Sequence, residues 1–368
     1  TNTNREGDQS KSLTIVQSPS SFLLPSLIMS SDSSSSGAIP KGTAAALQLV
    51  KCKLSASLLP GNLIANSKYY AYIHRNEVQL IDQKHIALGN EKSDVIKVAY
   101  TEKDAINQID FLKTPFGDVL IVINQAGGIY IYDEAGQKML HSYKHSKVTT
   151  LKDQHLRGIA FDGKETLFVG QGTGELLVFS LTKAKLALVK SINEVHVESS
   201  SHSGGISALC YCAKESTLVS GDDYGNIVFW SGAGADISPS RITRLDGANS
   251  PVNCLAYGHG HLAAAFTSGH IRLYDVAKKQ ITVEIAAHTR AINGVDIHPT
   301  KPYVMAASED TFISVWQLPT AANPQVKHLM AESPVLGLLT GARFGGANQE
   351  LIVNTTYDSR ALAIMHTP

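Results

Sequence analysis

The clearest pattern in the sequence is a pair of short apolar stretches, joined by a polar or glycine-containing turn, that recurs along the chain. The second stretch of each pair closes on an aromatic residue. Five copies are distinct, namely 120–133, 167–179, 218–230, 262–275 and 304–316, closing on Tyr132, Phe179, Trp230, Tyr274 and Trp316. β-Branched and aromatic residues dominate these segments, which favours strands over helices. We therefore expect an all-β chain with no helix.

The spacing of the copies indicates how many strands each repeat contains. The closing aromatic residues recur at intervals of 42 to 51 residues, and a further strand with alternating apolar residues precedes each copy, for example over 206–211. This period is typical of one four-stranded antiparallel blade of a β-propeller. Two weaker copies, 69–82 and 350–365, bring the number to seven. The sequence thus predicts a single seven-bladed β-propeller over residues 37–368.

The two ends of the predicted propeller are incomplete in complementary ways. Residues 44–54 are apolar enough for a strand but precede the first full repeat. The last repeat has only four residues after Ile364 and lacks an outer strand of its own. We expect the N-terminal strand to complete the last blade, because this pairing would also remove an edge prone to aggregation.

The first 36 residues differ in composition from the rest of the chain. They are rich in Ser, Thr, Asn and Gln, so we expect this segment to be disordered. The chain begins with Thr1, whereas Met29 opens a serine-rich run, so residues 1–28 need not belong to the native start. The apolar run 22–28 is short, contains Pro25 and has no small-residue cleavage site, which argues against a signal peptide. A cytoplasmic location is expected.

Charge and cysteine content narrow the function. Thirty-two basic residues balance thirty-two acidic ones, which argues against a nucleic-acid groove. No apolar stretch approaches the roughly 20 residues that span a bilayer. The four cysteines, Cys52, Cys210, Cys212 and Cys254, include no CxxC pair, and we expect packed free thiols rather than a metal site. No cofactor, membrane or small-molecule substrate is expected.

One repeat carries a motif that places the chain near a known family. His288, Ser308, Asp310 and Trp316 have a spacing that resembles the His–Ser–Asp–Trp tetrad of WD-repeat proteins. In that family the four buried side chains hydrogen-bond across the strands, which leaves no polar atom unpaired in a dry blade. Other repeats depart from the tetrad. Blade four keeps His202 and Trp230 but has Tyr224 at the aspartate position, and blade three keeps His155 but has Thr173 there.

The resemblance also extends to short runs outside the tetrad. These runs resemble one member of the WD-repeat family most closely: Thr43 to Leu47, 286–297, 308–318, 341–344 and Tyr357-Asp358. The family implies a protein-binding scaffold with no catalytic residue to carry over.

The resemblance further indicates which residues project from the top rim of the propeller. In WD-repeat proteins these are the position two after the tetrad histidine and the position before the turn aspartate. The first class gives Arg157 and Arg290, and the second gives Asp223 and Glu309. We expect these four residues to bind a partner of mixed charge. The alternative is that they are ordinary solvated charges.

Several motifs that could carry other chemistry have simpler explanations. The run GIAFDGK (158–164) fits the start of a P-loop, but Glu165 follows it and Ile159 to Phe161 read as a strand. The run GQGTG (170–174) is typical of a hairpin turn. His259 and His261 are expected in a solvated turn, and the sequon at Asn354 in an inner strand. There is no GxSxG elbow for a nucleophilic serine.

These observations favour a non-enzymatic scaffold whose partners are other proteins or peptides, with no nucleic acid expected. A rigid propeller holds its loop residues in place, so little entropy is lost when a partner docks. Two alternatives remain open. One is a propeller enzyme with an active site at the channel mouth, which would need carboxylates or histidines to converge there. The other is a reader of nucleic acid or of a modified peptide tail, which a basic or aromatic top surface would favour.

Overall fold

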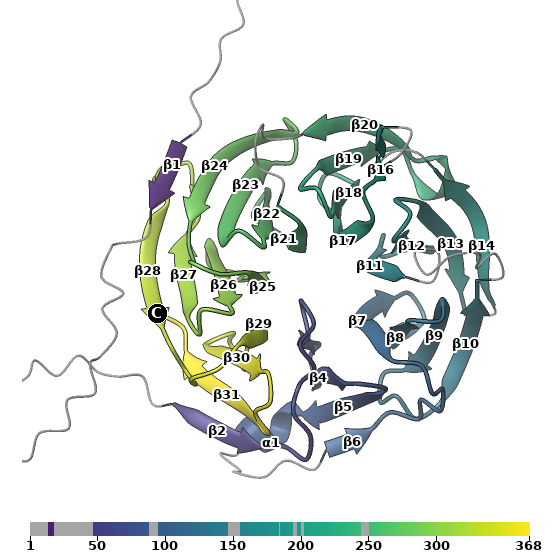
Figure 1. Ribbon diagram of the computed structural model, residues 1–368, viewed down its shortest axis with the longest axis horizontal. Helices are drawn as coiled ribbons and strands as arrows, with labels where there is room; N and C mark the ends of the chain where they lie inside the picture. The colour runs from purple at the N-terminus through teal and green to yellow at the C-terminus, as the bar shows by residue number, and fades with distance from the viewer. Residues whose placement is uncertain are drawn as a thin grey trace, which may run out of the picture.

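The protein is a ring of seven blades around a central opening, as the computed structural model shows (Figure 1). The described residues are 14–17, 47–87, 95–145, 155–183, 185–193, 197–199, 202–243 and 250–368. In the first six blades the first of the four strands along the chain lies innermost, in blade seven β29 does, and neighbouring strands within each set of four are antiparallel. The predicted seven-bladed propeller is confirmed.

The strands of the first four blades follow the chain in order. Blade one contains β3 (Ile64–Ala65), β4 (Tyr69–His74), β5 (Glu77–Asp82) and β6 (Val95–Lys97). Blade two contains β7 (Ile106–Thr114), β8 (Gly117–Asn124), β9 (Gly128–Asp133) and β10 (Met139–Lys144). Blade three contains β11 (Leu156–Phe161), β12 (Thr166–Gln171), β13 (Leu176–Thr182) and β14 (Lys185–Ile192). Blade four contains β17 (Ile206–Cys212), β18 (Thr217–Asp222), β19 (Ile227–Ser231) and β20 (Ser238–Thr243).

The remaining three blades complete the ring. Blade five contains β21 (Val252–Gly258), β22 (His261–Phe266), β23 (His270–Asp275) and β24 (Gln280–Ala286). Blade six contains β25 (Ile292–Ile297), β26 (Tyr303–Ser308), β27 (Ile313–Gln317) and β28 (Lys327–Glu332). Blade seven contains β29 (Leu339–Gly345), β30 (Leu351–Thr356), β31 (Ala361–His366) and, from the N-terminal part of the chain, β2 (Gln48–Lys51).

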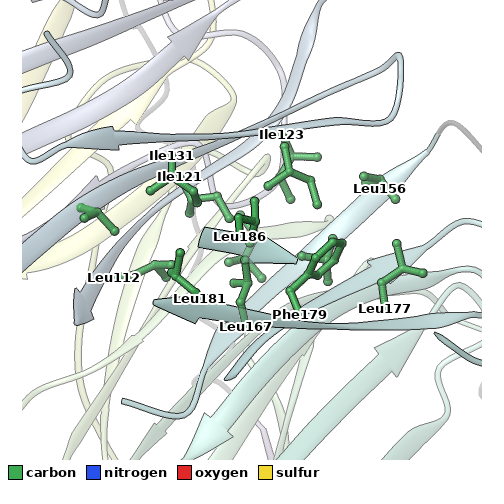
Figure 2. Close-up of a cluster of buried hydrophobic side chains, with 14 residues drawn as sticks. Leu112, Ile121, Ile123, Ile131, Leu156, Leu167, Leu177, Phe179, Leu181 and Leu186 are labelled. Carbon is green, nitrogen blue, oxygen red and sulfur yellow. The ribbon is translucent and has the colours of Figure 1, made fainter. Parts of the chain in front are cut away.

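The hydrophobic core lies between the blades. The second strand of a blade is buried on both faces because a neighbouring blade packs on each side, so β12 is buried along its whole length. Figure 2 shows one such layer, in which Ile121 and Ile131 of blade two face Leu167 and Phe179 of blade three. Phe179 is fully buried, and replacing a buried phenylalanine with alanine typically costs about 3–5 kcal/mol.

The two ends of the propeller meet in blade seven. Strand β2 pairs antiparallel with β31, from Gln48 opposite Ile364 to Lys51 opposite Ala361. Val50 of β2 is completely buried. Closure of the last blade by the N-terminal strand is therefore confirmed; β2 covers Gln48–Lys51 within the expected 44–54, of which residues 44–46 lie outside the described part of the chain.

A few short elements lie outside the repeat. Where no helix was expected, the described residues contain the single-turn helix α1 (Gln83–Ala87) and the 3-10 turn η1 (Gly234–Asp236). A small hairpin, β15 (Val197–Ser199) and β16 (His202–Ser203), precedes blade four.

One strand lies within the segment 1–36 that was expected to be disordered. Strand β1 (Thr14–Gln17) pairs in parallel with β24 (Figure 1), and Val16 packs against the apolar cluster of blades five and six. The expectation of disorder therefore does not hold for these four residues. The other residues of 1–36, and the expected start of the propeller at residues 37–46, lie outside the described part of the chain.

Candidate functional site

One face of the ring collects the turns that were predicted to bind a partner. We call it the top face. The innermost strands begin there, and the second and third strands of each blade are joined there by a turn. Arg157 lies near the start of β11, and Asp223 lies in the turn between β18 and β19. Arg290 precedes β25, and Glu309 follows β26. All four predicted residues thus lie on the top face.

The four residues meet as two separate ion pairs. Arg157 Nη2 lies 3.2 Å from Asp223 Oδ1, which links blades three and four. Arg290 Nη2 lies 3.4 Å from Glu309 Oε2 within blade six. The exposed fractions of the side chains are 39% and 41% in the first pair and 59% and 22% in the second. Exposed pairs of this kind contribute at most about 1 kcal/mol to stability.

The tetrad residues of blade six form a buried chain of hydrogen bonds with one change from the expected set. His288 Nδ1 lies 3.1 Å from both carboxylate oxygens of Asp310. On the other side of the imidazole, His288 Nε2 lies 2.8 Å from Ser314 Oγ. The same oxygen accepts a hydrogen bond from Trp316 Nε1 at 3.1 Å. The hydroxyl between the histidine and the tryptophan is therefore that of Ser314, and not that of Ser308.

The position of each serine along its strand explains the exchange. Ser308 ends β26 beside the turn, where its hydroxyl donates to the carbonyl of Arg290 and accepts the N–H of Asp310, both at 3.2 Å. Ser314 lies two residues before Trp316 on β27, and side chains two apart on a strand point to the same face. Ser314 can therefore reach the indole while Ser308 supports the turn.

The carboxyl group of Asp310 is held in its charged form. Burial disfavours the charge, but the hydrogen bond with His288, and the N–H groups of Thr289 and Phe312, together keep the pKa of Asp310 below its ordinary value. The turn of blade six is therefore supported by an ionised carboxylate at neutral pH.

Blade four replaces the missing turn aspartate with another one nearby. Asp222 Oδ1 accepts the N–H groups of Tyr224 and Asn226, and its Oδ2 accepts the Asn226 side-chain amide at 2.7 Å. Trp230 Nε1 donates to Ser220 Oγ at 2.9 Å. Ser220 and Asp222 were not predicted, although both stand in the run that ends in Trp230. The side chain of His202 lies outside the described part of the structure.

Blade three is less complete than blade four. The buried hydroxyl of Thr173 has no hydrogen-bond partner in the described structure, so this residue does not take over the role of the aspartate. His155 is exposed, and its Nδ1 lies 3.4 Å from the side-chain amide of Asn107.

A second set of polar residues ties neighbouring blades together below the top face. In four blades the second residue of the innermost strand donates from its side chain to the first carbonyl of the next blade. We call these the latch residues: Asn107 to Leu156, Ser207 to Val252, Asn253 to Ile292 and Asn293 to Leu339, at 3.3, 2.6, 3.0 and 3.0 Å.

Arg157 occupies the latch position of blade three. Instead of a carbonyl, it reaches the side chain of Asp223 in the next blade. The latch residues were missed in the sequence, where the available signal was a polar residue after the first apolar position of each innermost strand, as in INQI, ISAL and VNCL.

The central channel contains a cavity of about 280 Å³ that opens near Arg157. Deeper in the channel, Arg343 Nη1 donates to the carbonyl of Val295 at 3.1 Å. Burial raises the pKa of Asp110 to about 6, although the charge of Arg343 opposes this rise. Among the lining residues, Asp110 is the one carboxylate and His155 the one histidine, and they come from different blades.

The motifs that resembled other sites lie in ordinary structural positions. Gly158 to Phe161 belong to β11, and residues 172–175 form the turn between β12 and β13. His259 and His261 lie at the turn between β21 and β22, where each bonds a carbonyl of the next blade, at 2.8 and 3.1 Å. Asn354 is buried in β30, and its amide donates to Ala363. The strand and turn predictions for residues 158–174 and for Asn354 are confirmed, whereas His261 begins β22 and is partly buried, so it does not lie in the expected solvated turn.

The four cysteines are all free thiols. Burial raises the pKa of the Cys254 thiol to about 11, so this thiol is protonated at neutral pH. Within the described ranges, no group of three or more His, Cys, Asp or Glu side chains could hold a metal ion. No helix in the described part of the chain is long and apolar enough to cross a membrane.

Comparison with known proteins places this geometry in a family. A family model described as WDR54 matches residues 35–365. WD repeat-containing protein 54 from Homo sapiens is 27% identical over 333 residues, which cover 86% of this chain and 94% of that protein. WD repeat domain 54 from Rattus norvegicus is 25% identical over 334 residues, with the same two coverages. The short runs noted in the sequence resemble this same protein, so that resemblance is confirmed.

More distant matches support the fold alone. A 77 kDa echinoderm microtubule-associated protein from Lytechinus variegatus is 24% identical over 204 residues, which cover 55% of this chain and 29% of that protein. A chain in a solved structure titled "Crystal Structure of Mitotic Checkpoint Complex" has a TM-score of 0.70 and 12% identity. That match covers 94% of this chain and 99% of the other.

Proposed function

Because the chain belongs to the WDR54 family of WD-repeat propellers, we propose that it acts as a non-enzymatic scaffold that binds other proteins or peptides through its top face. The observation that carries this proposal is the placement of Arg157, Asp223, Arg290 and Glu309. They lie on three blades of one face, as two ion pairs that leave donors and acceptors accessible. A partner of mixed charge could add hydrogen bonds to both members of each pair.

The rigidity of the blades supports the same proposal. Latch residues and interblade apolar clusters hold the top turns in place, so docking would order few side chains and lose little entropy. We further propose that the role is cytoplasmic and that the partners are proteins rather than nucleic acid. The balance of acidic and basic residues supports this choice.

Charge reversal on the top face tests the proposal. The double variant Arg157→Glu/Arg290→Glu should keep the circular dichroism spectrum and the cooperative melting of the parent protein, with only a small fall in melting temperature, because exposed ion pairs contribute little to stability. In quantitative affinity capture from cells, it should lose the proteins that the parent retains. A matched control is Arg157→Glu/Asp223→Arg, which exchanges the charges within one pair and should fold equally well.

Two results bear on the choice of face. The top face would not be the binding surface if the double reversal left the captured proteins unchanged while reversal of Lys214, on the opposite face, removed them. Lys214 is exposed in the turn between β17 and β18, so it reports on that opposite face.

A further inference from the structure

The place where the ring closes carries a second pocket on the top face. The pocket has a volume of about 330 Å³ and lies between blade seven and blade one. Its floor is the segment 54–57, which leads from β2 to β3. Its walls are two turns, one containing His74 and Arg75 between β4 and β5, the other containing Tyr357, Asp358 and Arg360 between β30 and β31.

Hydrogen bonds fix the two walls to the floor. The N–H of Arg75 donates to Ser57 Oγ at 2.7 Å, and the N–H of Cys52 donates to the carbonyl of Arg360 at 2.8 Å. His74 Nδ1 lies 2.7 Å from the carbonyl of Ser55. These hydrogen bonds hold the backbone around the pocket in place at the junction between blades seven and one.

The arginines of this pocket differ from those of the predicted rim pairs. Arg157 and Arg290 each have a carboxylate partner. Arg75 and Arg360 are exposed, and neither guanidinium group forms an ion pair with a described residue. The one carboxylate at the pocket, Asp358, is outnumbered by the two guanidinium groups. The pocket thus offers two guanidinium groups that form no ion pair within the described part of the chain.

Large apolar side chains are exposed on the pocket wall and on the loops that adjoin the pocket. Tyr357 is 47% exposed, Leu58 is 43% exposed and Leu336 is 90% exposed. Leu58 follows the pocket floor directly, and the loop of Leu336 is joined to the wall because the N–H of Tyr357 donates to the carbonyl of Leu338 at 2.8 Å. Exposed apolar side chains grouped in this way mark interaction sites more often than scattered ones do.

We infer that this closure pocket binds an acidic peptide segment. Carboxylates of the segment would pair with Arg75 and Arg360, for which the guanidinium group provides two parallel donors. An apolar side chain next to those carboxylates would pack on Leu58, Leu336 and Tyr357. The inference rests on the proposed role of the top face in protein binding, and it adds a site and a partner chemistry that are separate from the rim pairs.

Selection from a random heptapeptide library displayed on phage, with the full chain as bait, tests the inference. We expect the enriched peptides to contain several Asp or Glu residues beside a Leu, Ile or Phe. A fluorescein-labelled enriched peptide should then bind at least about tenfold more weakly to Arg75→Glu/Arg360→Glu, as measured by fluorescence anisotropy. Tyr357→Ser should also weaken binding. Lys214→Glu, on the opposite face, should leave the dissociation constant unchanged.

Each outcome has a definite meaning. Enriched peptides without acidic residues, or unchanged affinity in a folded Arg75→Glu/Arg360→Glu variant, would overturn the inference. Loss of acidic-peptide binding in Arg157→Glu/Arg290→Glu, with no effect at the closure pocket, would overturn it in favour of the rim pairs. In a third outcome, Arg75→Glu/Arg360→Glu loses the acidic peptide while Arg157→Glu/Arg290→Glu still captures the same cellular proteins. That result would support the closure pocket and contradict the assignment of the rim pairs as the binding site.

Discussion

Inside blade six, a single hydroxyl group connects two side chains that would otherwise be unsatisfied. Ser314 lies between the imidazole of His288 and the indole of Trp316, and all three are buried. A buried donor without an acceptor costs about 1–3 kcal/mol. The stability of the blade therefore depends on residues that are far apart in sequence but share one hydrogen-bond chain.

Replacing that hydroxyl should have a measurable effect. We expect Ser314→Ala to lower the free energy of unfolding by about 1–3 kcal/mol, because it strands His288 Nε2 and Trp316 Nε1. The control is Ser333→Ala, an exposed serine whose hydroxyl lies 3.1 Å from that of Thr311, with an expected change below about 0.5 kcal/mol. Urea denaturation followed by tryptophan fluorescence measures both, and equal effects would contradict the hydrogen-bond chain.

Asp110 gives a residue-level prediction about pH. Its pKa is raised to about 6 by burial in the channel, compared with about 3.9 in an unfolded chain. Between these values the native protein holds a proton that the unfolded chain has released, so native stability falls as pH rises from about 4 to 6. Asp110→Asn does not titrate and so does not lose this stability. Its denaturation midpoint should therefore exceed that of the parent protein by an amount that grows as the pH rises across that range. A constant difference between the two proteins from pH 4 to 7 would rule this out.

The sequence located some of these residues and missed others for a physical reason. The spacing of His288, Asp310 and Trp316 was sufficient, because turn and strand lengths fix their separation. It could not distinguish Ser308 from Ser314, since that choice depends on which side chain faces the indole once the strands pair. Asp222 was missed because a turn can be held by a carboxylate at either of two nearby positions.

Whole strands are joined to their neighbours by the latch residues. Asn253 and Asn293 each donate from one blade to the first carbonyl of the next, whereas Arg157 reaches an exposed carboxylate instead. The junction between blades three and four therefore replaces a neutral latch with an ion pair that salt screens. This junction combines a structural role with a place on the predicted binding surface.

The two kinds of junction should respond differently to truncation. Asn253→Ala should lower the free energy of unfolding by about 1–2 kcal/mol, because the carbonyl of Ile292 loses its donor. Arg157→Ala should lower it by at most about 1 kcal/mol, with little effect in 0.5 M salt. Denaturant unfolding at two salt concentrations compares them. A larger loss for Arg157→Ala at both concentrations would show that the ion pair is the stronger junction.

The strands themselves were predictable because each blade repeats the same apolar pattern with the same period. The elements that were not predicted lack that period. Strand β1 has four residues and helix α1 has five, too short for a periodic signal. The latch residues were missed for a different reason, because one polar residue in an apolar strand does not reveal whose carbonyl it will meet.

For the whole ring, closure by β2 is the decisive contact. Deleting residues 1–53 removes the outer strand of blade seven and the buried side chain of Val50. We expect an aggregated or molten product, visible by size-exclusion chromatography and by loss of a cooperative calorimetric transition. Deleting residues 1–36 is the matched control and should leave the melting temperature nearly unchanged, because β1 is a four-residue strand at the outer edge of blade five. A monomeric 54–368 fragment that melts cooperatively would contradict this prediction.

The closed ring also has a consequence for how the protein is made. The hydroxyl of Thr355 donates to the carbonyl of Asn62, a contact between residues 293 positions apart, and β2 pairs with a strand near the end of the chain. During synthesis β2 leaves the ribosome before the other strands of the propeller, and its partner β31 is the last of these strands to be translated. An unpaired strand edge is exposed throughout that interval, when a growing chain is most prone to aggregate. A circular permutant opened between blades six and seven would make all four strands of blade seven neighbours in translation, and it should give more soluble protein at 37 °C than the natural order.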